Sequence, residues 1–284
     1  MTKIQQKRTR PVEKAWYIVK PLVFYTMIKT FVILGLSLLV SSMPQDGISV
    51  WVTNNSKLLS TSINGIAALI GVSFVLQDFL KEVAVIGEID IDSGVIKQLL
   101  AWGQNGIKHN KDKIFHLAAV VSLGITSALG LNILIELLSI RSDSYSNVEA
   151  IQYSVPLWLG LLLYGLVSPI TEEIIFRGIT YNRMKRFFGV VPCILVTALL
   201  FGGFHANLPQ FLYGTCMGVL MAFVYEWVKS FAAPLLFHMA ANLVVFVLSF
   251  SSLETQIVSI ITGITLLALS ILLLLYLYKN RIKI

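Results

Sequence analysis

VPLWLGLLLYGLVSPITEEIIFRG, residues 155–178, joins a long apolar run to two adjacent glutamates and an arginine. The apolar part is long enough for a transmembrane helix, which needs about 20 residues to cross a bilayer. A charged side chain inside such a helix costs a few kcal/mol, so a chain seldom keeps one without a reason. Glu172, Glu173 and Arg177 are therefore expected either to neutralise one another or to perform a function in the membrane.

The whole chain is unusually apolar. Of its 284 residues 56% are hydrophobic and only 13% are charged, and the mean hydropathy is +0.78. In soluble domains roughly a quarter of the residues are charged. We therefore predict an all-α integral membrane protein, a single polytopic domain over residues 1–284. About eight transmembrane helices are expected, at residues 22–43, 62–80, 115–138, 155–176, 190–205, 211–228, 231–250 and 257–278.

The basic residues gather on one side of these spans. With the N-terminus in the cytoplasm, all but three of the 22 Lys and Arg fall in cytoplasmic segments; Lys57 and Arg141 lie outside and Lys29 lies within the first span. This distribution follows the positive-inside rule, so both termini are predicted to be cytoplasmic in a multi-pass protein of the cell membrane, if the source is bacterial. Attraction to the anionic inner leaflet explains the net charge of +7, and no nucleic-acid partner is predicted.

The two glutamates are expected to have different roles. Residues four apart share a helix face, so Glu173 can pair with Arg177 while Glu172 points elsewhere. Glu173 would then be structural, and the Glu172 carboxylate would face a cavity and remain available for proton transfer. An ion pair that only fastens helices is the alternative, but it leaves Glu172 unexplained.

His205, in LLFGGFHAN, lies at the end of the next predicted span. An antiparallel hairpin that turns near Phe188 and Gly189 would place Glu172 and His205 at the same height, near enough to share a water molecule. A lone histidine in such a helix is more often a hydrogen-bonded packing residue. The stretch GTCMG, residues 214–218, is a GxxxG pattern that we interpret as a helix contact.

Gly202 and Gly203, just before His205, remove side chains where a substrate backbone or a neighbouring helix could approach closely. Of these two interpretations, helix packing is slightly favoured.

In FAAPLLFHMAAN, His238 and Asn242 lie four residues apart and share a face of the seventh predicted span. Such a donor pair could stabilise a substrate oxyanion, or it could form an ordinary interhelical hydrogen bond worth about 0.6 to 2 kcal/mol. His205 is expected deep in the bilayer, whereas His238 follows Pro234 near the cytoplasmic end of its helix. The two can meet if the fifth helix tilts or protrudes inward, or if the chain break at residues 207–209 lies inside the membrane.

These motifs, in this order, resemble those of the CAAX protease and bacteriocin-processing family, also called the abortive infection or type II CAAX endopeptidase family. The resemblance covers about residues 150–250 and includes the FRG that follows the glutamates, and we see no part of it in the first 150 residues. The matching positions are EExxxR at Glu172, Glu173 and Arg177, FxxxH at Phe201 and His205, and HxxxN at His238 and Asn242.

The resemblance implies an eight-helix, glutamate-dependent intramembrane endopeptidase with its catalytic core in helices four to seven and no cofactor. Glu172 would be the general base that activates water, assisted by His205. The expected partners are the lipid bilayer and a peptide or lipid-anchored protein substrate, reached through a cavity that opens toward the cytoplasmic leaflet. In a bacterium the activity would serve peptide maturation, bacteriocin processing or self-immunity. The oligomeric state stays open.

The other motif residues have supporting roles by the same resemblance. Glu173 and Arg177 would order the site, and His238 with Asn242 would stabilise the tetrahedral oxyanion.

Three alternatives stay open. Glu172, His205 and His238 could supply three ligands to a catalytic zinc ion, although the HExxH motif is absent. The polar cluster could instead hold helices together in a non-catalytic immunity or scaffold protein. A small-solute transporter is disfavoured, because the chain has one dense polar cluster in place of paired broken helices.

Overall fold

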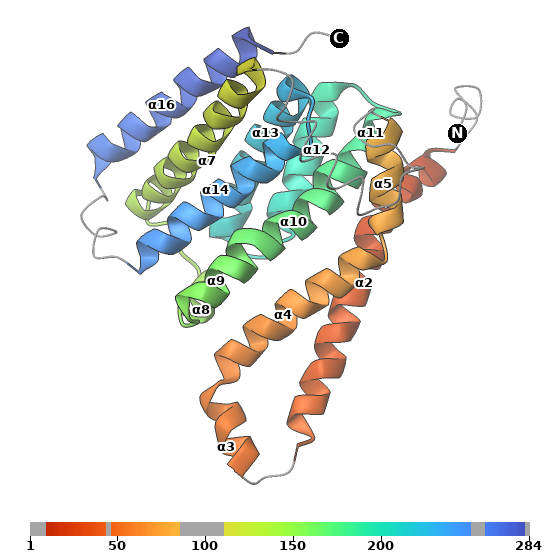
Figure 1. Ribbon diagram of the computed structural model, residues 1–284, viewed down its shortest axis with the longest axis vertical. Coiled ribbons are helices and arrows are strands. Elements are labelled where there is room, and N and C mark those ends of the chain that lie inside the picture. The colour runs from red at the N-terminus through yellow and green to blue at the C-terminus, as the bar shows by residue number, and fades with distance from the viewer. Residues whose placement is uncertain (1–9, 44–46, 86–110, 251–258, 282–284) are drawn as a thin grey trace.

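The computed structural model describes residues 10–43, 47–85, 111–250 and 259–281 (Figure 1). All the regular elements within these ranges are helices, which confirms the predicted all-α class. Two of them, labelled η, are π-helical. In chain order they are α2 (Pro11–Ser41), α3 (Gly47–Asn54), α4 (Ser56–Ser73), α5 (Leu76–Val85), α7 (Lys111–Leu137), α8 (Asp143–Gln152), α9 (Leu157–Leu162), η2 (Leu163–Val167), α10 (Ser168–Glu173), η3 (Ile174–Tyr181), α11 (Asn182–Lys185), α12 (Val190–Gly203), α13 (Leu208–Val228), α14 (Ala232–Ser249) and α16 (Ile260–Lys279).

The number of full-length spans differs from the expected eight. Among the described residues, six helices are long and apolar enough to cross a membrane, and the bent pair α4–α5 would be a seventh. All eight predicted apolar segments contain helix, but α4 and α5 bend by 56° at a break and α12 has only 14 residues. The six complete spans are α2, α7 from Phe115, the continuous run Leu157–Lys185, α13, α14 and α16.

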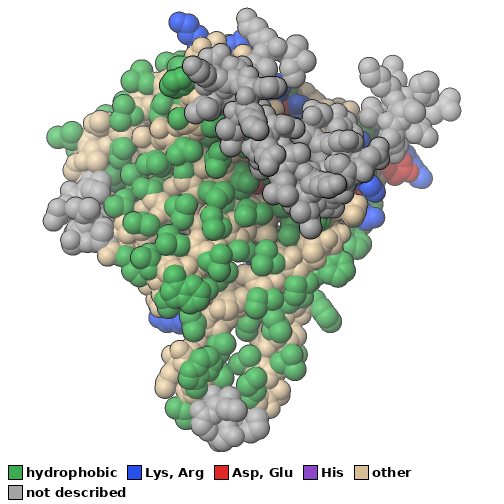
Figure 2. All heavy atoms as spheres, in the orientation of Figure 1, with side chains coloured by type: hydrophobic (Ala, Val, Ile, Leu, Met, Phe, Trp, Pro, Cys, Tyr) green, Lys and Arg blue, Asp and Glu red, His purple; other side chains and the backbone are tan. Residues whose placement is uncertain are grey.

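The bundle is built around the helical run that contains the glutamates. Leu157–Lys185 has the largest buried share of the six spans, 56%, and the side chains of Ile175, Phe176 and Ile179 in η3 are fully buried. The helices α16, α7 and α14 pack side by side, and α2 and α4 form a hairpin that extends from the rest of the bundle (Figure 1). Hydrophobic side chains cover much of the face seen in Figure 2, as expected for a surface in contact with lipid.

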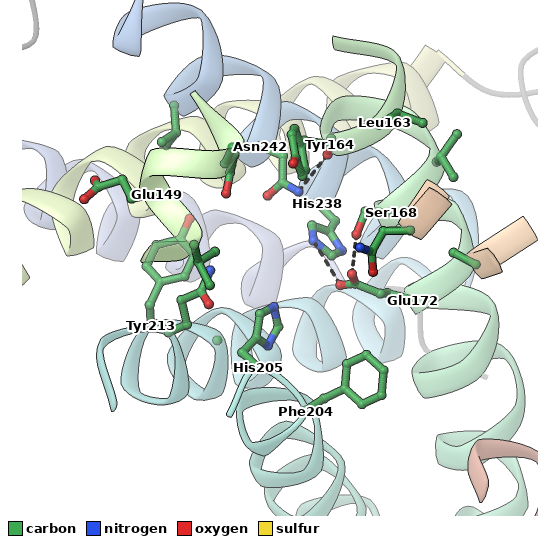
Figure 3. A pocket seen from close by; sticks show the side chains of 18 of the residues that line it. Glu149, Leu163, Tyr164, Ser168, Glu172, Phe204, His205, Tyr213, His238 and Asn242 are labelled. Carbon is green, nitrogen blue, oxygen red and sulfur yellow. Dashed lines mark hydrogen bonds and ion pairs between the residues drawn. The ribbon is translucent and has the colours of Figure 1, made fainter. Parts of the chain in front are cut away.

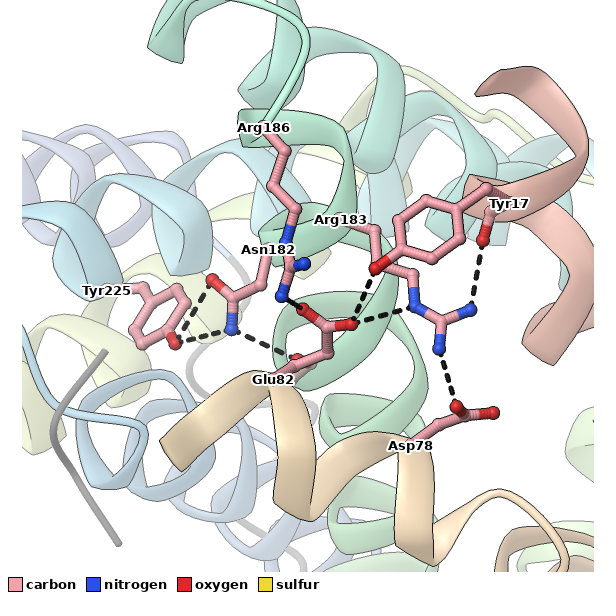
Figure 4. Close-up of polar contacts among 8 residues, drawn as sticks. Tyr17, Asp78, Glu82, Asn182, Arg183, Arg186 and Tyr225 are labelled. Atoms are coloured by element: carbon pink, nitrogen blue, oxygen red, sulfur yellow. Dashed lines mark hydrogen bonds and ion pairs between the residues drawn. The ribbon is translucent and has the colours of Figure 1, made fainter. Parts of the chain in front are cut away.

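A network of ion pairs ties α5 and α2 to the end of the central run (Figure 4). Arg183 on α11 donates to Glu82 (3.0 Å), to Asp78 (2.6 Å) and to the backbone oxygen of Tyr17 (2.9 Å). Arg186 also pairs with Glu82, a carboxylate that is almost completely buried. The bend between α4 and α5 directs α5 toward these arginines, so the second predicted span is broken where the charged contacts begin. The predicted cytoplasmic connection, residues 81–113, lies mostly outside the described residues.

The shortness of α12 has a local cause. The helix ends at Gly203, and Ala206 then takes a left-handed conformation with φ 56° that turns the chain into α13. The Asn207 side chain caps α13 by accepting a hydrogen bond from the Gln210 backbone (3.0 Å). Fourteen residues rise about 21 Å, less than the ~30 Å hydrocarbon core. This length agrees with the possibility that the break at residues 207–209 lies inside the membrane.

Glycines let α12 and α13 approach closely. A Cβ on Gly202 would lie 2.5 Å from the backbone oxygen of Phe211, and a Cβ on Gly218 would lie 3.0 Å from the Cα of Ala198. Gly214 faces Gly202 across the same contact. The GxxxG pattern is therefore a helix contact, as predicted, and Gly202 also has a packing role.

Candidate active site

A cavity of about 490 Å³ lies inside the bundle and contains four of the six predicted site residues. Its walls come from α2, α4, α7 and α8, from the run η2–α10, from the α12–α13 turn and from α14. The side chains of Glu172, His205, His238 and Asn242 all point into this space (Figure 3).

The two adjacent glutamates face different surroundings. Glu172, on α10, lines the cavity with 13% of its side chain exposed, whereas the Glu173 side chain is completely buried. One oxygen of Glu172 accepts a hydrogen bond from Ser168, four residues earlier, and the other lies 3.8 Å from His238 Nε2. The helix therefore directs Glu172 toward the cavity and Glu173 toward the protein interior.

Glu173 forms the expected ion pair with Arg177. Arg177 Nη1 donates to Glu173 Oε1 at 2.8 Å, and both side chains are fully buried. Arg177 Nη2 donates to the backbone oxygen of Gly218 at 3.1 Å, and the guanidinium lies 4.7 Å from the centre of the Phe201 ring. This pair thus connects the central helix to α12 and α13 from behind the cavity wall.

His238 joins the ion pair to the cavity. Its Nδ1 lies 2.9 Å from Glu173 Oε1, the same oxygen that accepts from Arg177. An ionised carboxylate only accepts hydrogen bonds, so Nδ1 carries the proton and donates. Nε2 is consequently directed toward Glu172 (Figure 3). The chain from Arg177 through Glu173 keeps the proton on Nδ1 and fixes the direction of this imidazole.

His205 is oriented by its own helix. Its Nδ1 donates to the backbone oxygen of Phe201 at 3.0 Å, which leaves Nε2 as the acceptor nitrogen of the neutral ring. The Phe201 ring lies edge-to-face against both histidines, 5.3 Å from His205 and 5.5 Å from His238 between ring centres. The short α12 therefore brings His205 and His238 to the same level of the bundle.

Asn242 makes the interhelical hydrogen bond that sequence analysis gave as its alternative role. Its Nδ2 donates to the backbone oxygen of Tyr164 at 2.9 Å, which ties α14 to η2. Because a carboxamide nitrogen has two hydrogens, one donor remains for the cavity that Asn242 lines.

Several residues of the site were missed by sequence analysis. Ser168, Tyr25 and Lys29 line the cavity, and Ser168 bonds directly to Glu172. Nearly half of the lining residues precede residue 154, so the first part of the chain forms a wall of the site. Lys29 could have been found, since a lone cation inside a predicted span is itself a functional signal.

The cavity does not reach toward the basic end of the bundle that carries the Arg183 network. It extends instead to α8, where Val148 and Ile151 are exposed at its edge. Which end of the bundle faces the cytoplasm stays a prediction, and so does the opening of the cavity toward the cytoplasmic leaflet. Within the described residues, no group of three or more His, Cys, Asp or Glu side chains is arranged to hold a metal ion.

Comparison with known proteins identifies the segment that carries these residues. Residues 154–244 match the family model described as type II CAAX prenyl endopeptidase Rce1-like, which confirms the resemblance over this segment. The curated relatives include "Putative membrane peptidase YdiL" of Bacillus subtilis (strain 168), 30% identical over 102 residues. They also include "Membrane-embedded CAAX protease MroQ" of Staphylococcus aureus (strain USA300), 27% identical over 107 residues. Each alignment covers 36% of this chain and less than half of the relative, 41% and 42% respectively. No solved structure matches the chain.

Proposed function

We propose that the protein is an intramembrane endopeptidase in which Glu172 activates the attacking water. The observation that carries this proposal is that the two adjacent glutamates have different surroundings. Glu172 faces a cavity with two histidines, while Glu173 is buried in the ion pair that orients one of those histidines. The match of residues 154–244 to a type II CAAX prenyl endopeptidase family, and the peptidase names of both relatives, support the same reaction class.

In the proposed reaction Glu172 takes a proton from water while the water oxygen attacks the carbonyl carbon of the scissile peptide bond. The unprotonated Nε2 of His205 assists by accepting a hydrogen bond from the same water. The proton held by Glu172 then passes to the leaving amine as the carbon–nitrogen bond breaks. Ser168 donates to Glu172 and holds its carboxylate in one orientation. General base catalysis of this kind contributes about 10² to 10⁴ in rate.

His238 is proposed to stabilise the oxyanion that forms on the carbonyl oxygen. With its second nitrogen protonated, the imidazole presents Nε2–H to the cavity beside Glu172, and the remaining N–H of Asn242 is the second donor. Arg177 and Glu173 hold the imidazole in place before the substrate arrives, so no reorganisation is needed during the reaction. Removal of one such donor costs about 10² to 10³ in kcat.

The proposed substrate is a peptide or a lipid-anchored protein, and its cleavage would serve peptide maturation, bacteriocin processing or self-immunity. The reaction needs no metal ion, because the carboxylate and the imidazoles supply the base and the oxyanion donor. A zinc enzyme built on Glu172, His205 and His238 is the chemical competitor that the test must separate.

The test compares purified wild type with the Glu172→Gln variant in lipid nanodiscs. Each is incubated with lipidated and unlipidated peptides, with and without a chelator, and the products are read by mass spectrometry. We expect cleavage by wild type, loss of at least about 10² in rate in the variant, and no effect of the chelator. The control Glu136→Gln makes the same change at a half-exposed carboxylate far along α7, and should keep full activity.

Three outcomes would contradict the proposal. Loss of activity on chelation would assign the site to the zinc class. Full activity of Glu172→Gln would remove the proposed base. No cleavage by wild type, with a cellular phenotype that the variant preserves, would identify the polar cluster as a scaffold.

A further inference from the structure

Lys29 is the only Lys or Arg among the residues that line the cavity in the described part of the chain. It lies on α2, far outside the matched segment 154–244, and one turn after Tyr25, which lines the same wall. Residues four apart share a helix face, so α2 presents both side chains to the site. The chain thus places a cation from its N-terminal part in the wall of the cavity that holds the proposed catalytic groups.

The Lys29 ammonium has unused hydrogen-bond donors. Its Nζ lies 5.7 Å from the centre of the Phe204 ring, and no hydrogen bond or ion pair to it is formed within the described ranges. Glu172 lines the same cavity, but its ion-pair contact is with His238 and not with Lys29. An ammonium carries three N–H donors.

The two buried arginines of the bundle differ from Lys29. Arg177 and Arg183 each donate to at least two acceptors. A cation without acceptors inside a membrane helix is costly to keep, and it is expected to pair with an anion.

We propose that Lys29 binds a carboxylate of the peptide substrate and so selects peptides that carry one near the scissile bond. This inference rests on the proposed function, because it names the substrate class of the same site. A carboxylate has the negative charge and the acceptors that can pair with the ammonium, and a charge-assisted hydrogen bond is stronger than a neutral one. The carboxylate can belong to an acidic side chain or to the peptide C-terminus.

A simpler role for Lys29 would be that of a counter-ion to Glu172. The two roles predict different results. A counter-ion would influence every substrate equally, whereas an anchor would discriminate between a carboxylate and its neutral amide. The test therefore changes both the lysine and the ligand.

The experiment measures binding without cleavage. The Glu172→Gln protein in phosphatidylcholine nanodiscs is titrated into fluorescein-labelled apolar hexapeptides, and anisotropy gives the Kd. The peptides end in a free acid or in an amide, and a second pair carries an internal Glu or Gln with an amidated end. We expect the preferred acid form to bind roughly ten- to a hundredfold more tightly than its amide partner. Whichever pair shows the preference identifies the source of the carboxylate.

Variants of Lys29 in the same background then identify the anchor. Lys29→Gln should remove the preference for the acid, and Lys29→Arg should retain most of it because it keeps a cation. The control is Lys20→Gln on the same helix, since Lys20 also lies over a ring, 5.5 Å from Phe24, but is exposed and does not line the cavity. Thermal midpoints of all variants verify folding.

Two results would overturn the inference. One is equal affinity for the acid and amide forms of both peptide pairs, including no measurable binding of either form. The other is an acid preference that persists in Lys29→Gln. Neither depends on turnover, so a failure of the anchor is distinguished from a failure of the proposed peptidase, which the cleavage assay decides by itself.

Discussion

Breaking the buried Glu173–Arg177 pair should destabilise the protein strongly, and neutralising both partners should destabilise it much less. Both side chains are fully buried, and Arg177 Nη1 lies 2.8 Å from Glu173 Oε1. In Arg177→Met the Glu173 carboxylate keeps its charge but retains only the His238 Nδ1–H as a donor. In Glu173→Gln the guanidinium is the unpaired charge. In the double variant neither charge remains, and the carboxamide introduced by Glu173→Gln still offers an oxygen to His238.

The magnitude follows from this geometry. Removal of one member of a buried ion pair costs about 3 to 5 kcal/mol, mostly because the other charge stays buried without a partner. Arg177→Met also loses the 3.1 Å hydrogen bond to the Gly218 oxygen, worth about 1 kcal/mol. That loss occurs in the single and in the double variant, so it cancels from the double-mutant cycle. We expect a coupling energy of at least about 2 kcal/mol in the cycle.

The assay is a denaturant titration of the purified protein in detergent, which gives the free energy of unfolding. Wild type and the three variants are measured together. The matched control is Arg10→Met, which breaks an exposed pair with Glu13 and should cost no more than about 1 kcal/mol. If the losses of unfolding free energy in the two single variants sum to the loss in the double variant, the two charges are not coupled. The interpretation of Glu173 and Arg177 as a buried orienting pair is then refuted.

Two further substitutions probe the α12–α13 contact and the proposed catalytic carboxylate of Glu172. Gly202→Ala places a Cβ 2.3 Å from Thr215 Oγ1 and should lower the free energy of unfolding by about 1 to 3 kcal/mol in the same assay. The control Gly203→Ala, whose Cβ would have nothing within 4 Å, should be nearly neutral. Equal effects of the two substitutions would contradict the packing role of Gly202. Ser168→Ala removes one donor from Glu172 and should reduce kcat about tenfold in the cleavage assay while leaving the unfolding transition unchanged; an unaltered kcat would show that this hydrogen bond does not position the base.

The sequence predicted the helical class well because hydropathy depends on local composition. Each apolar run became helix, and the helix-packing interpretation of GTCMG was correct. The count of full-length spans was less accurate, because it depends on contacts distant in sequence. Hydropathy could not show that α5 bends to meet Arg183, nor that a left-handed Ala206 ends the fifth segment early.

The site was predictable where spacing along one helix determines it. The i,i+4 rule anticipated the pairing of Glu173 with Arg177 and the separate direction of Glu172. It could not show that His238 bonds to Glu173, since that contact joins residues 65 positions apart. Nor could it show that α4 and α8 supply part of the cavity wall, because neither helix carries a recognisable motif.

Part of the cavity wall lies within the segment that matches the family model and part lies outside it. This division decides which properties can be compared among relatives. All seven motif residues lie within the matched segment, whereas Lys29 and the wall formed by α2, α4 and α8 lie outside it. A second protein that matches only residues 154–244 can share the proposed catalytic groups without sharing the proposed substrate contacts elsewhere in the cavity. Binding energy from those remote contacts decides which peptide is positioned for reaction. Reaction class is therefore the property that the matched segment supports, and substrate choice should change when α2, α4 or α8 changes.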